Sequence, residues 1–169
     1  RYFAGEMDRA ASARVQTERS LRRALERGEL VLHYQPQVST GDSQPCGAEA
    51  LVRWQHPELG LQAPGCFIQV AEDSGLIVPL GRWELAEPCR QRRLWLDQGW
   101  DGWRISVNLS ARQFQQDDLA DQVRAALHDS GLPAHCLELE ITESVAMRRP
   151  EDTARVMHEL RALGVSFAI

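Results

Sequence analysis

Three short segments of this chain alternate polar and apolar residues at every second position, and each is followed by a segment with the apolar spacing of a helix. They read GAEALVRWQHP from Gly47, RISVNL from Arg104 and LELEIT from Leu137. A period of two predicts β-strands, and strands that alternate with helices predict βα units and a mostly parallel sheet. A parallel sheet covered by helices rarely has a polar face. The exception is a closed barrel, which gathers polar groups at the carboxyl ends of its strands, and we therefore expect an α/β barrel.

The first segment places an acid and a base on one face of its strand. Glu49, Leu51 and Arg53 share that face, because side chains alternate between the two faces. Glu49 is a suitable ligand for a hard cation, and Arg53, about 13 Å further along the strand, can hold a phosphate with its forked guanidinium. For this pair alone, a surface Glu and Arg beside a buried strand is the simpler interpretation. The two later strands favour the functional interpretation.

Glu49, Asn108 and Glu140 all fall near the carboxyl ends of the predicted strands. Those ends meet at one rim of a barrel, where active sites of such folds are built. The three side chains are oxygen donors, with no His or Cys among them. This donor set suits Mg²⁺ or Mn²⁺ rather than zinc.

With these motifs the chain resembles the EAL domain, a family of bacterial phosphodiesterases that open cyclic di-GMP to linear pGpG. GAEALVRWQHPELG, ISVNLSARQF, LELEITES and LGVSFAI are similar to successive motifs of that family in order and spacing, over about residues 30–169. The resemblance implies a TIM-like (β/α)8 barrel whose first strand is antiparallel. Because a barrel of this kind typically has about 250 residues, we expect about its first half to two thirds within these 169 residues.

The resemblance implies a metal centre. The family's metal ligands are the first-motif Glu, the Asn of the NLS motif and the first Glu of the E-x-T-E motif, which correspond to Glu49, Asn108 and Glu140, with Glu49 as a catalytic residue. An Asp-Asp pair that completes a two-metal Mg²⁺ or Mn²⁺ site is expected directly after Ile169, and a Lys, a Glu and a Gln further on. Since two-metal hydrolysis needs both cations, we expect residues 1–169 alone to be inactive and the complete protein to cleave cyclic di-GMP.

The same resemblance implies three contacts with cyclic di-GMP. Arg53 corresponds to the residue that holds a substrate phosphate. Gln35, in the HYQP segment, corresponds to a residue that touches the nucleotide, and Leu51 to one that packs against it.

Two other functions stay open. A degenerate EAL module binds cyclic di-GMP as a sensor or effector without cleaving it; such modules usually lack the first Glu or another ligand, whereas Glu49 is present. The chain could also be a plain βα scaffold that serves to bind another molecule. In that case the matching alternation of polar and apolar residues in the three strands would be accidental.

The composition of the chain limits the classes of partner and the kinds of site that can be expected. A net charge of -5 and a pI near 5.5 leave no basic excess to neutralise a nucleic-acid backbone, so no nucleic-acid polymer is expected as a partner. The four cysteines form no C-x-x-C motif, which favours free thiols over a zinc or redox site. No apolar run approaches the length of a membrane helix, about 18 residues. We expect a cytoplasmic domain, with any membrane tether of the parent protein outside this segment.

The N-terminal residues predict a domain boundary. Residues 7–27 have the charge density and apolar spacing of an amphipathic helix and resemble the linker between a GGDEF domain and an EAL domain. We therefore assign residues 1–28 to the end of a preceding domain plus the linker, and residues 29–169 to the N-terminal part of an EAL domain. The alternative is that this helix is simply the first of the domain. A GGDEF or other sensory domain is the expected partner in the same chain, and an open sheet edge near residue 165 invites a homodimer.

The expected elements follow from periodicity and from turn residues. Pro88 is expected to kink or split the second long helix. Strands are expected at residues 30–37 and 46–54, as an antiparallel hairpin, and at 104–109, 137–142 and 165–169; helices are expected at 64–73, 79–98, 118–129 and 150–163.

Overall fold

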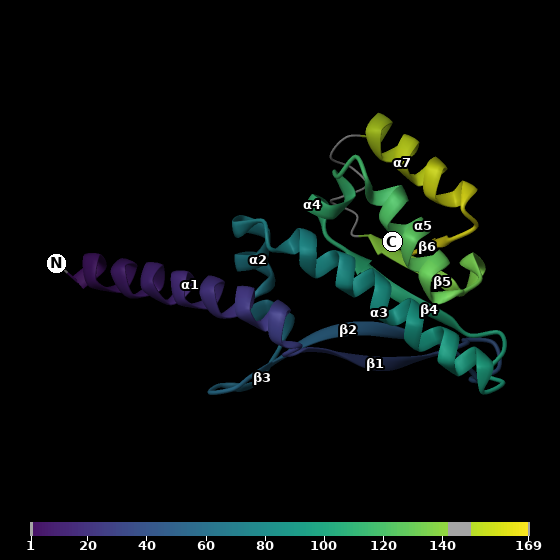
Figure 1. Ribbon diagram of the computed structural model, residues 1–169, viewed down its shortest axis with the longest axis horizontal. Coiled ribbons are helices and arrows are strands. Elements are labelled where there is room, and N and C mark those ends of the chain that lie inside the picture. Colours follow the sequence, from purple (N-terminus) through teal and green to yellow (C-terminus); the bar gives the residue numbers. More distant parts are fainter. Residues whose placement is uncertain (1, 142–149, 169) are drawn as a thin grey trace. The chain divides into compact units, whose positions relative to one another are not determined.

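A computed structural model describes residues 2–141 and 150–168, with side chains from 11–141 and 153–168 (Figure 1). The helices are α1 (Tyr2–Arg27), α2 (Ile68–Ser74), α3 (Ile77–Asp97), α4 (Ala111–Phe114), α5 (Leu119–Ser130) and α7 (Pro150–Ala162), with 3-10 turns at Pro64–Cys66 and Ala134–Cys136. The strands are β1 (Leu30–Val38), β2 (Pro45–His56), β3 (Gly60–Gln62), β4 (Arg104–Leu109), β5 (Leu137–Ile141) and β6 (Ser166–Ala168).

Contacts divide the chain into two compact units. The first contains residues 1–31 and 52–80, and the second contains residues 32–51 and 81–169. In the first unit α1 packs against α2, and the indole of Trp54 donates to a Glu29 carboxylate oxygen at 3.1 Å while its ring meets Phe67 edge to face. The small apolar centre of this unit therefore joins residues of β2 to the loop before α2.

The strands form one sheet in the order β1-β2-β4-β5-β6, with β3 added to β2. Strands β2, β4, β5 and β6 are parallel neighbours. Strands β1 and β2 are adjacent and joined by a short turn, which requires them to run antiparallel because a parallel pair needs a long crossover. The expected parallel-dominated α/β sheet with an antiparallel first strand is confirmed, and it is open among the described residues.

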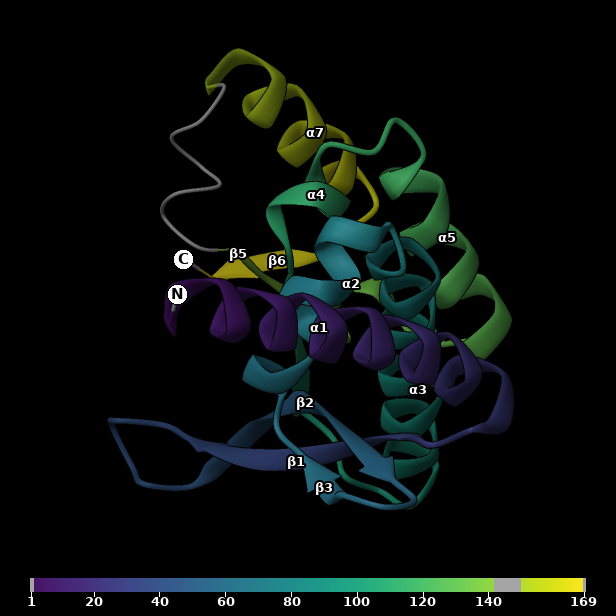
Figure 2. The ribbon, with the colours of Figure 1, turned by 90° about the vertical axis from the view of Figure 1, so that its left-hand side faces the viewer.

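The core of the second unit lies between one face of the sheet and the helices. Figures 1 and 2 show α5 and α7 over the same side of β4, β5 and β6. Buried apolar residues alternate along β2, β4 and β5 and meet apolar stripes from the helices, as the period of two predicts. The fully buried members include Ile105, Leu137 and Leu139 from the strands, Cys89 from α3, Val123 from α5 and Leu160 from α7.

Several element boundaries differ from the sequence predictions. The helix expected at residues 64–73 is a 3-10 turn followed by α2, and α3 runs continuously from Ile77 to Asp97, so it is not split at Pro88. The predictions missed β3 and α4, because three or four residues are too few to display a period. The expected strand ends at residues 142 and 169 lie outside the described residues. Among the helices of the described ranges, none has both the length and the apolar character to cross a membrane.

Candidate functional site

The polar face of the sheet gathers the candidate site. The register places Glu49 of β2 beside Ser106 of β4, and Asn108 of β4 beside Glu140 of β5. The strands are parallel, so residues with matching parity fall into neighbouring rows on one face. The register therefore brings Glu49, Asn108 and Glu140 together from strands that are far apart in sequence.

The three candidate metal ligands interact directly or through their charges. The amide Nδ2 of Asn108 donates to Oε1 of Glu49 at 2.7 Å, so the carbonyl oxygen of Asn108 is the atom that would bind a cation. Partial burial, and secondly the negative charge of Glu49, raise the pKa of Glu140 above its ordinary value. Two neighbouring carboxylates that repel each other provide a favourable environment for a divalent cation.

This donor set fits a hard cation. It consists of two carboxylates and one amide oxygen, which are the ligands that Mg²⁺ and Mn²⁺ prefer. Within residues 11–141 and 153–168, no group of three or more His, Cys, Asp or Glu side chains is arranged to hold a metal ion. The candidate centre therefore depends on the amide of Asn108 as well as on Glu49 and Glu140.

A second polar layer supports these ligands, and sequence reasoning did not assign it a role. Gln37 of β1 donates from Nε2 to Glu140 at 3.4 Å and to the hydroxyl of Ser106 at 3.3 Å. The Ser106 hydroxyl, fully buried, donates to Glu138 at 3.1 Å, and Arg104 pairs with the same carboxylate at 3.3 Å. The parity of β4 and β5 already placed Ser106 and Glu138 on the polar face, but nothing in the sequence showed that Gln37 reaches them.

Gly47 of β2 makes room for this layer. A Cβ atom there would lie 2.8 Å from the carbonyl oxygen of Arg104 and 3.0 Å from Oε1 of Gln37. Both distances are shorter than ordinary contacts of a methyl group. The first residue of the GAEAL motif is therefore a glycine because β4 and the Gln37 amide approach the strand closely.

The three residues that are predicted to contact the substrate, Gln35, Leu51 and Arg53, lie on β1 and β2. Gln35 is exposed on β1 and Leu51 is partly buried on β2, both in the second unit. Arg53 belongs to the first unit and is partly buried, and its guanidinium donates to the carbonyl oxygen of Val52 at 2.8 Å. The structure thus brings the three candidate metal ligands together within the second unit, whereas Arg53 belongs to the first.

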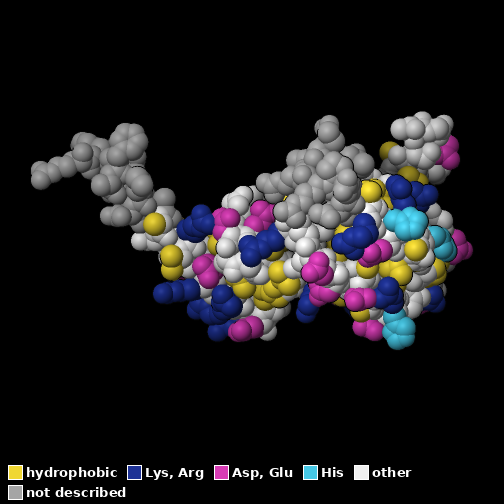
Figure 3. Space-filling view, turned by 90° about the horizontal axis from the view of Figure 1, so that it is seen from above, with side chains coloured by type: hydrophobic (Ala, Val, Ile, Leu, Met, Phe, Trp, Pro, Cys, Tyr) yellow, Lys and Arg dark blue, Asp and Glu magenta, His cyan; other side chains and the backbone are white. Residues whose placement is uncertain are grey.

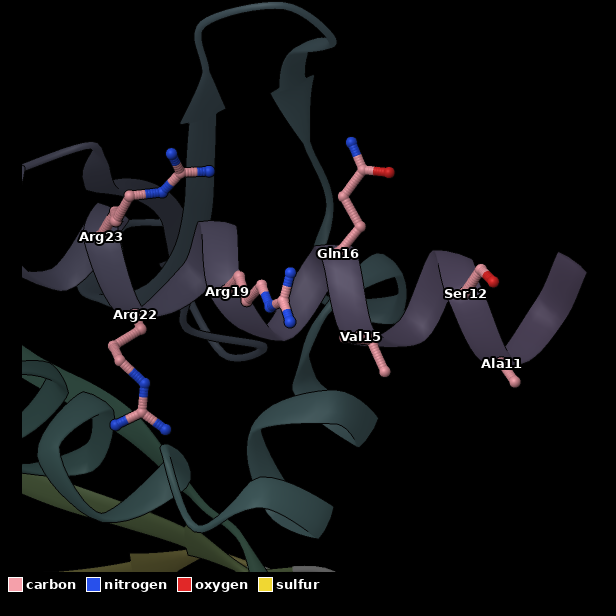
Figure 4. Close-up of a pocket in the computed structure, with 7 residues that line it drawn as sticks. All are labelled: Ala11, Ser12, Val15, Gln16, Arg19, Arg22 and Arg23. Atoms are coloured by element: carbon pink, nitrogen blue, oxygen red, sulfur yellow. The ribbon is translucent and has the colours of Figure 1, made fainter. Parts of the chain in front are cut away.

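The surface of the described residues carries charged side chains of both signs and a hollow along α1. Acidic and basic side chains are interspersed over the face seen in Figure 3. Figure 4 shows a hollow along α1 whose arginines project in different directions instead of converging on one point. It is lined by Ala11, Ser12, Val15, Gln16, Arg19, Arg22 and Arg23. Diverging guanidinium groups on a single helix do not form a cradle for an anion.

The chain is similar to several known proteins. It is 48% identical over 168 residues to the bifunctional diguanylate cyclase/cyclic di-GMP phosphodiesterase MucR of Pseudomonas aeruginosa, a match that covers 99% of this chain and 24% of MucR. It is 40% identical over 168 residues to the cyclic di-GMP phosphodiesterase NbdA of the same organism, covering 99% of this chain and 22% of NbdA.

A solved structure shares the fold. The MucR phosphodiesterase in complex with c-di-GMP superposes with a TM-score of 0.89 at 50% sequence identity, covering 91% of this chain and 62% of that one. The chain spans about a quarter of the length of the curated relatives MucR and NbdA. The sequence matches the EAL domain over residues 18–169, which is most of its length. The chain therefore belongs to the EAL domain family.

Proposed function

We propose that the complete protein hydrolyses cyclic di-GMP to linear pGpG with Mg²⁺ or Mn²⁺ in a two-metal site. The observation that carries this proposal is the grouping of Glu49, Asn108 and Glu140 on the polar face of the sheet. The relatives MucR and NbdA are named as cyclic di-GMP phosphodiesterases, which supports the same substrate here.

In this proposal Glu49, Asn108 and Glu140 hold one divalent cation, which, when bound, lowers the pKa of a water molecule and offsets charge on the phosphate. The two carboxylates supply the negative charge that retains the cation. The hydrogen bond from Asn108 to Glu49 holds both side chains in place, and Gln37 holds the carboxylate of Glu140. A fixed ligand geometry matters because misplaced ligands weaken both metal binding and alignment of the attacking water.

The substrate contacts are proposed from the same family. Arg53 would hold a phosphate oxygen through N–H donors of its guanidinium, of which Nη1 donates to the carbonyl of Val52 in this structure. Gln35 would contact the nucleotide by hydrogen bonds, and the apolar side chain of Leu51 would pack against it.

Replacing Glu49 with Gln tests the chemical proposal. Gln keeps the size of the side chain but removes the negative charge, so we expect kcat to fall by at least about 100-fold. Formation of pGpG from cyclic di-GMP is followed by chromatography of the complete protein with Mn²⁺, and Glu58→Gln, an exposed change in a turn, is the control. Normal turnover in the Glu49 variant would refute the ligand assignment. Binding of cyclic di-GMP without turnover in the wild type would favour the sensor function instead.

We further propose the domain organisation, the location and the oligomeric state of the complete protein. Residues 1–28 would be the end of a preceding domain and its linker, residues 29–169 would be the N-terminal part of the EAL domain, and a GGDEF or other sensory domain would share the chain. We propose a cytoplasmic location and a homodimer, which gel filtration with light scattering tests. Residues 1–169 alone would lack the second-metal carboxylates and would not form pGpG.

A further inference from the structure

A helix cap fixes the backbone just after Asn108. Ser110 is the N-cap residue of α4: its hydroxyl oxygen accepts from the backbone N–H of Gln113 at 3.3 Å, and its own N–H donates to Oε1 of Gln113 at 2.9 Å. This reciprocal pair is a capping box. Gln113 is 2% exposed, so its amide has little room to move. The turn that follows β4 is therefore held by a buried side chain.

Gln113 rests directly on the backbone of α3 at Gly81. A Cβ atom at position 81 would lie 2.6 Å from Cδ and 3.0 Å from Cγ of Gln113, and it would also overlap Nε2. Gly81 is not among the glycines with positive φ, so the backbone would accept alanine. Glycine inside a helix costs about 1 kcal/mol relative to alanine. The close seat of Gln113 gives a reason for glycine at this position.

The position of Asn108 depends on this turn more than the positions of Glu49 and Glu140 do. The ladder between β2 and β4 ends at the Ala50–Val107 pair, so on that side Asn108 lies beyond the last pair, while β5 holds it on the other side. Asn108 itself is exposed. Its position therefore rests on β5, on the bond to Glu49 and on the capped turn that begins at Ser110.

We propose that Gly81, Gln113 and Ser110 form a lock, here called the Gly81 lock, that positions Asn108 as a metal ligand. The proposal rests on the proposed function, because it assumes that Asn108 binds a cation. The three are positioning residues: Gly81 lets the Gln113 amide reach Ser110, and Ser110 fixes the backbone two residues beyond Asn108. Helix α3, which carries Gly81, is held in place by packing, since its Leu85 and Cys89 are 1% and 0% exposed in the core.

A double-mutant cycle on the complete protein tests the Gly81 lock. The variants are Gly81→Ala, Gln113→Ala and the double change, and the readout is the dissociation constant of Mn²⁺ alone, taken from the calorimetric component that Glu49→Ala removes. We expect each single change to weaken Mn²⁺ binding by about 10-fold, as is usual when the support of a metal ligand is lost. In the double variant the Gly81 change should add little, because the amide that it would displace is already gone.

Gly41→Ala is the matched control, because the nearest atom to a Cβ there is the Ser39 hydroxyl oxygen at an ordinary 3.8 Å. It should leave Mn²⁺ binding unchanged. If Gly81→Ala fails to fold, Gln113→Ala decides alone, since it removes the hydrogen bond from the Ser110 N–H to the Gln113 side chain without introducing a clash. Unchanged Mn²⁺ affinity in Gln113→Ala, or additive losses in the double variant, would overturn the lock.

The formation of pGpG separates the two proposals. A wild type that binds Mn²⁺ but forms no pGpG contradicts the proposed function and leaves the cycle valid for the metal site. A wild type that hydrolyses cyclic di-GMP, with Mn²⁺ affinity unaltered by both single changes, contradicts only the Gly81 lock. A wild type without the Glu49-dependent Mn²⁺ site overturns both.

Discussion

Replacing Glu84 with Gln is expected to stabilise the protein, and to do so more at pH 8 than at pH 5. Glu84 lies on α3, and burial raises the pKa of its carboxyl from the ordinary 4.5 to about 8. The folded protein therefore keeps a proton that the unfolded chain releases above about pH 4.5. Stability falls as the pH rises through this window and levels off above the folded pKa. Gln does not ionise, so the variant avoids that loss.

The size of the effect follows from the two pKa values. Each pH unit between the unfolded pKa of 4.5 and the experimental pH contributes about 1.4 kcal/mol, which sets an upper bound of about 3 kcal/mol at pH 7. The Glu84 residue is only partly buried, so solvent reduces the gain and we expect about 1–2 kcal/mol. For a domain of this size, that corresponds to a rise in Tm of about 2–8 °C.

The assay is thermal unfolding of the wild type and the Glu84→Gln variant between pH 5 and pH 9. Glu26→Gln, an exposed change on α1, is the control and should shift Tm by little at any pH. The difference in Tm between the Glu84 variant and the wild type should grow with pH until about pH 8. A constant difference across the range, or a variant less stable than the wild type at pH 8, would refute the reasoning that burial keeps Glu84 protonated.

Two further predictions concern binding and thiol reactivity. Arg53→Ala should raise KM more than it lowers kcat, and Arg53→Lys should recover only part of the loss because it lacks the guanidinium fork. The affinity for cyclic di-GMP is measured by calorimetry in a protein that also carries Glu49→Gln. An affinity that Arg53→Ala leaves unchanged would assign Arg53 a structural role. All four cysteines are free, with Cys46 and Cys66 exposed and Cys89 and Cys136 buried, and burial raises the pKa of the Cys89 thiol to about 12. In the native protein a thiol reagent should therefore label only the exposed pair, as mapped by mass spectrometry, and labelling of Cys89 before unfolding would contradict this packing.

Some features could be predicted from the sequence because they depend on local periodicity. The period of two in β4 and β5 placed Asn108 and Glu140 on polar faces and their neighbours in the core, and the structure confirms that parity. The βα rhythm predicted a parallel-dominated sheet, which the register confirms. The motifs predicted the resemblance to the EAL family, and the match to the EAL domain over residues 18–169 confirms it.

Other features required the tertiary structure, because they join residues that no local pattern relates. Gln37 reaches Glu140 across 103 positions in the sequence, and Gly81 meets Gln113 through the packing of α3 against the turn after β4. The division of β2 between two compact units also follows from packing.

The sequence by itself determined which face of each strand is polar, since adjacent side chains must point in opposite directions along an extended backbone. Only the tertiary structure decided how those faces align. The register between β4 and β5 set Asn108 beside Glu140, and burial on α3 gave Glu84 a raised pKa. Register and burial depend on how whole elements pack. The residues that determine them are far apart in the sequence and come into contact only in the folded chain.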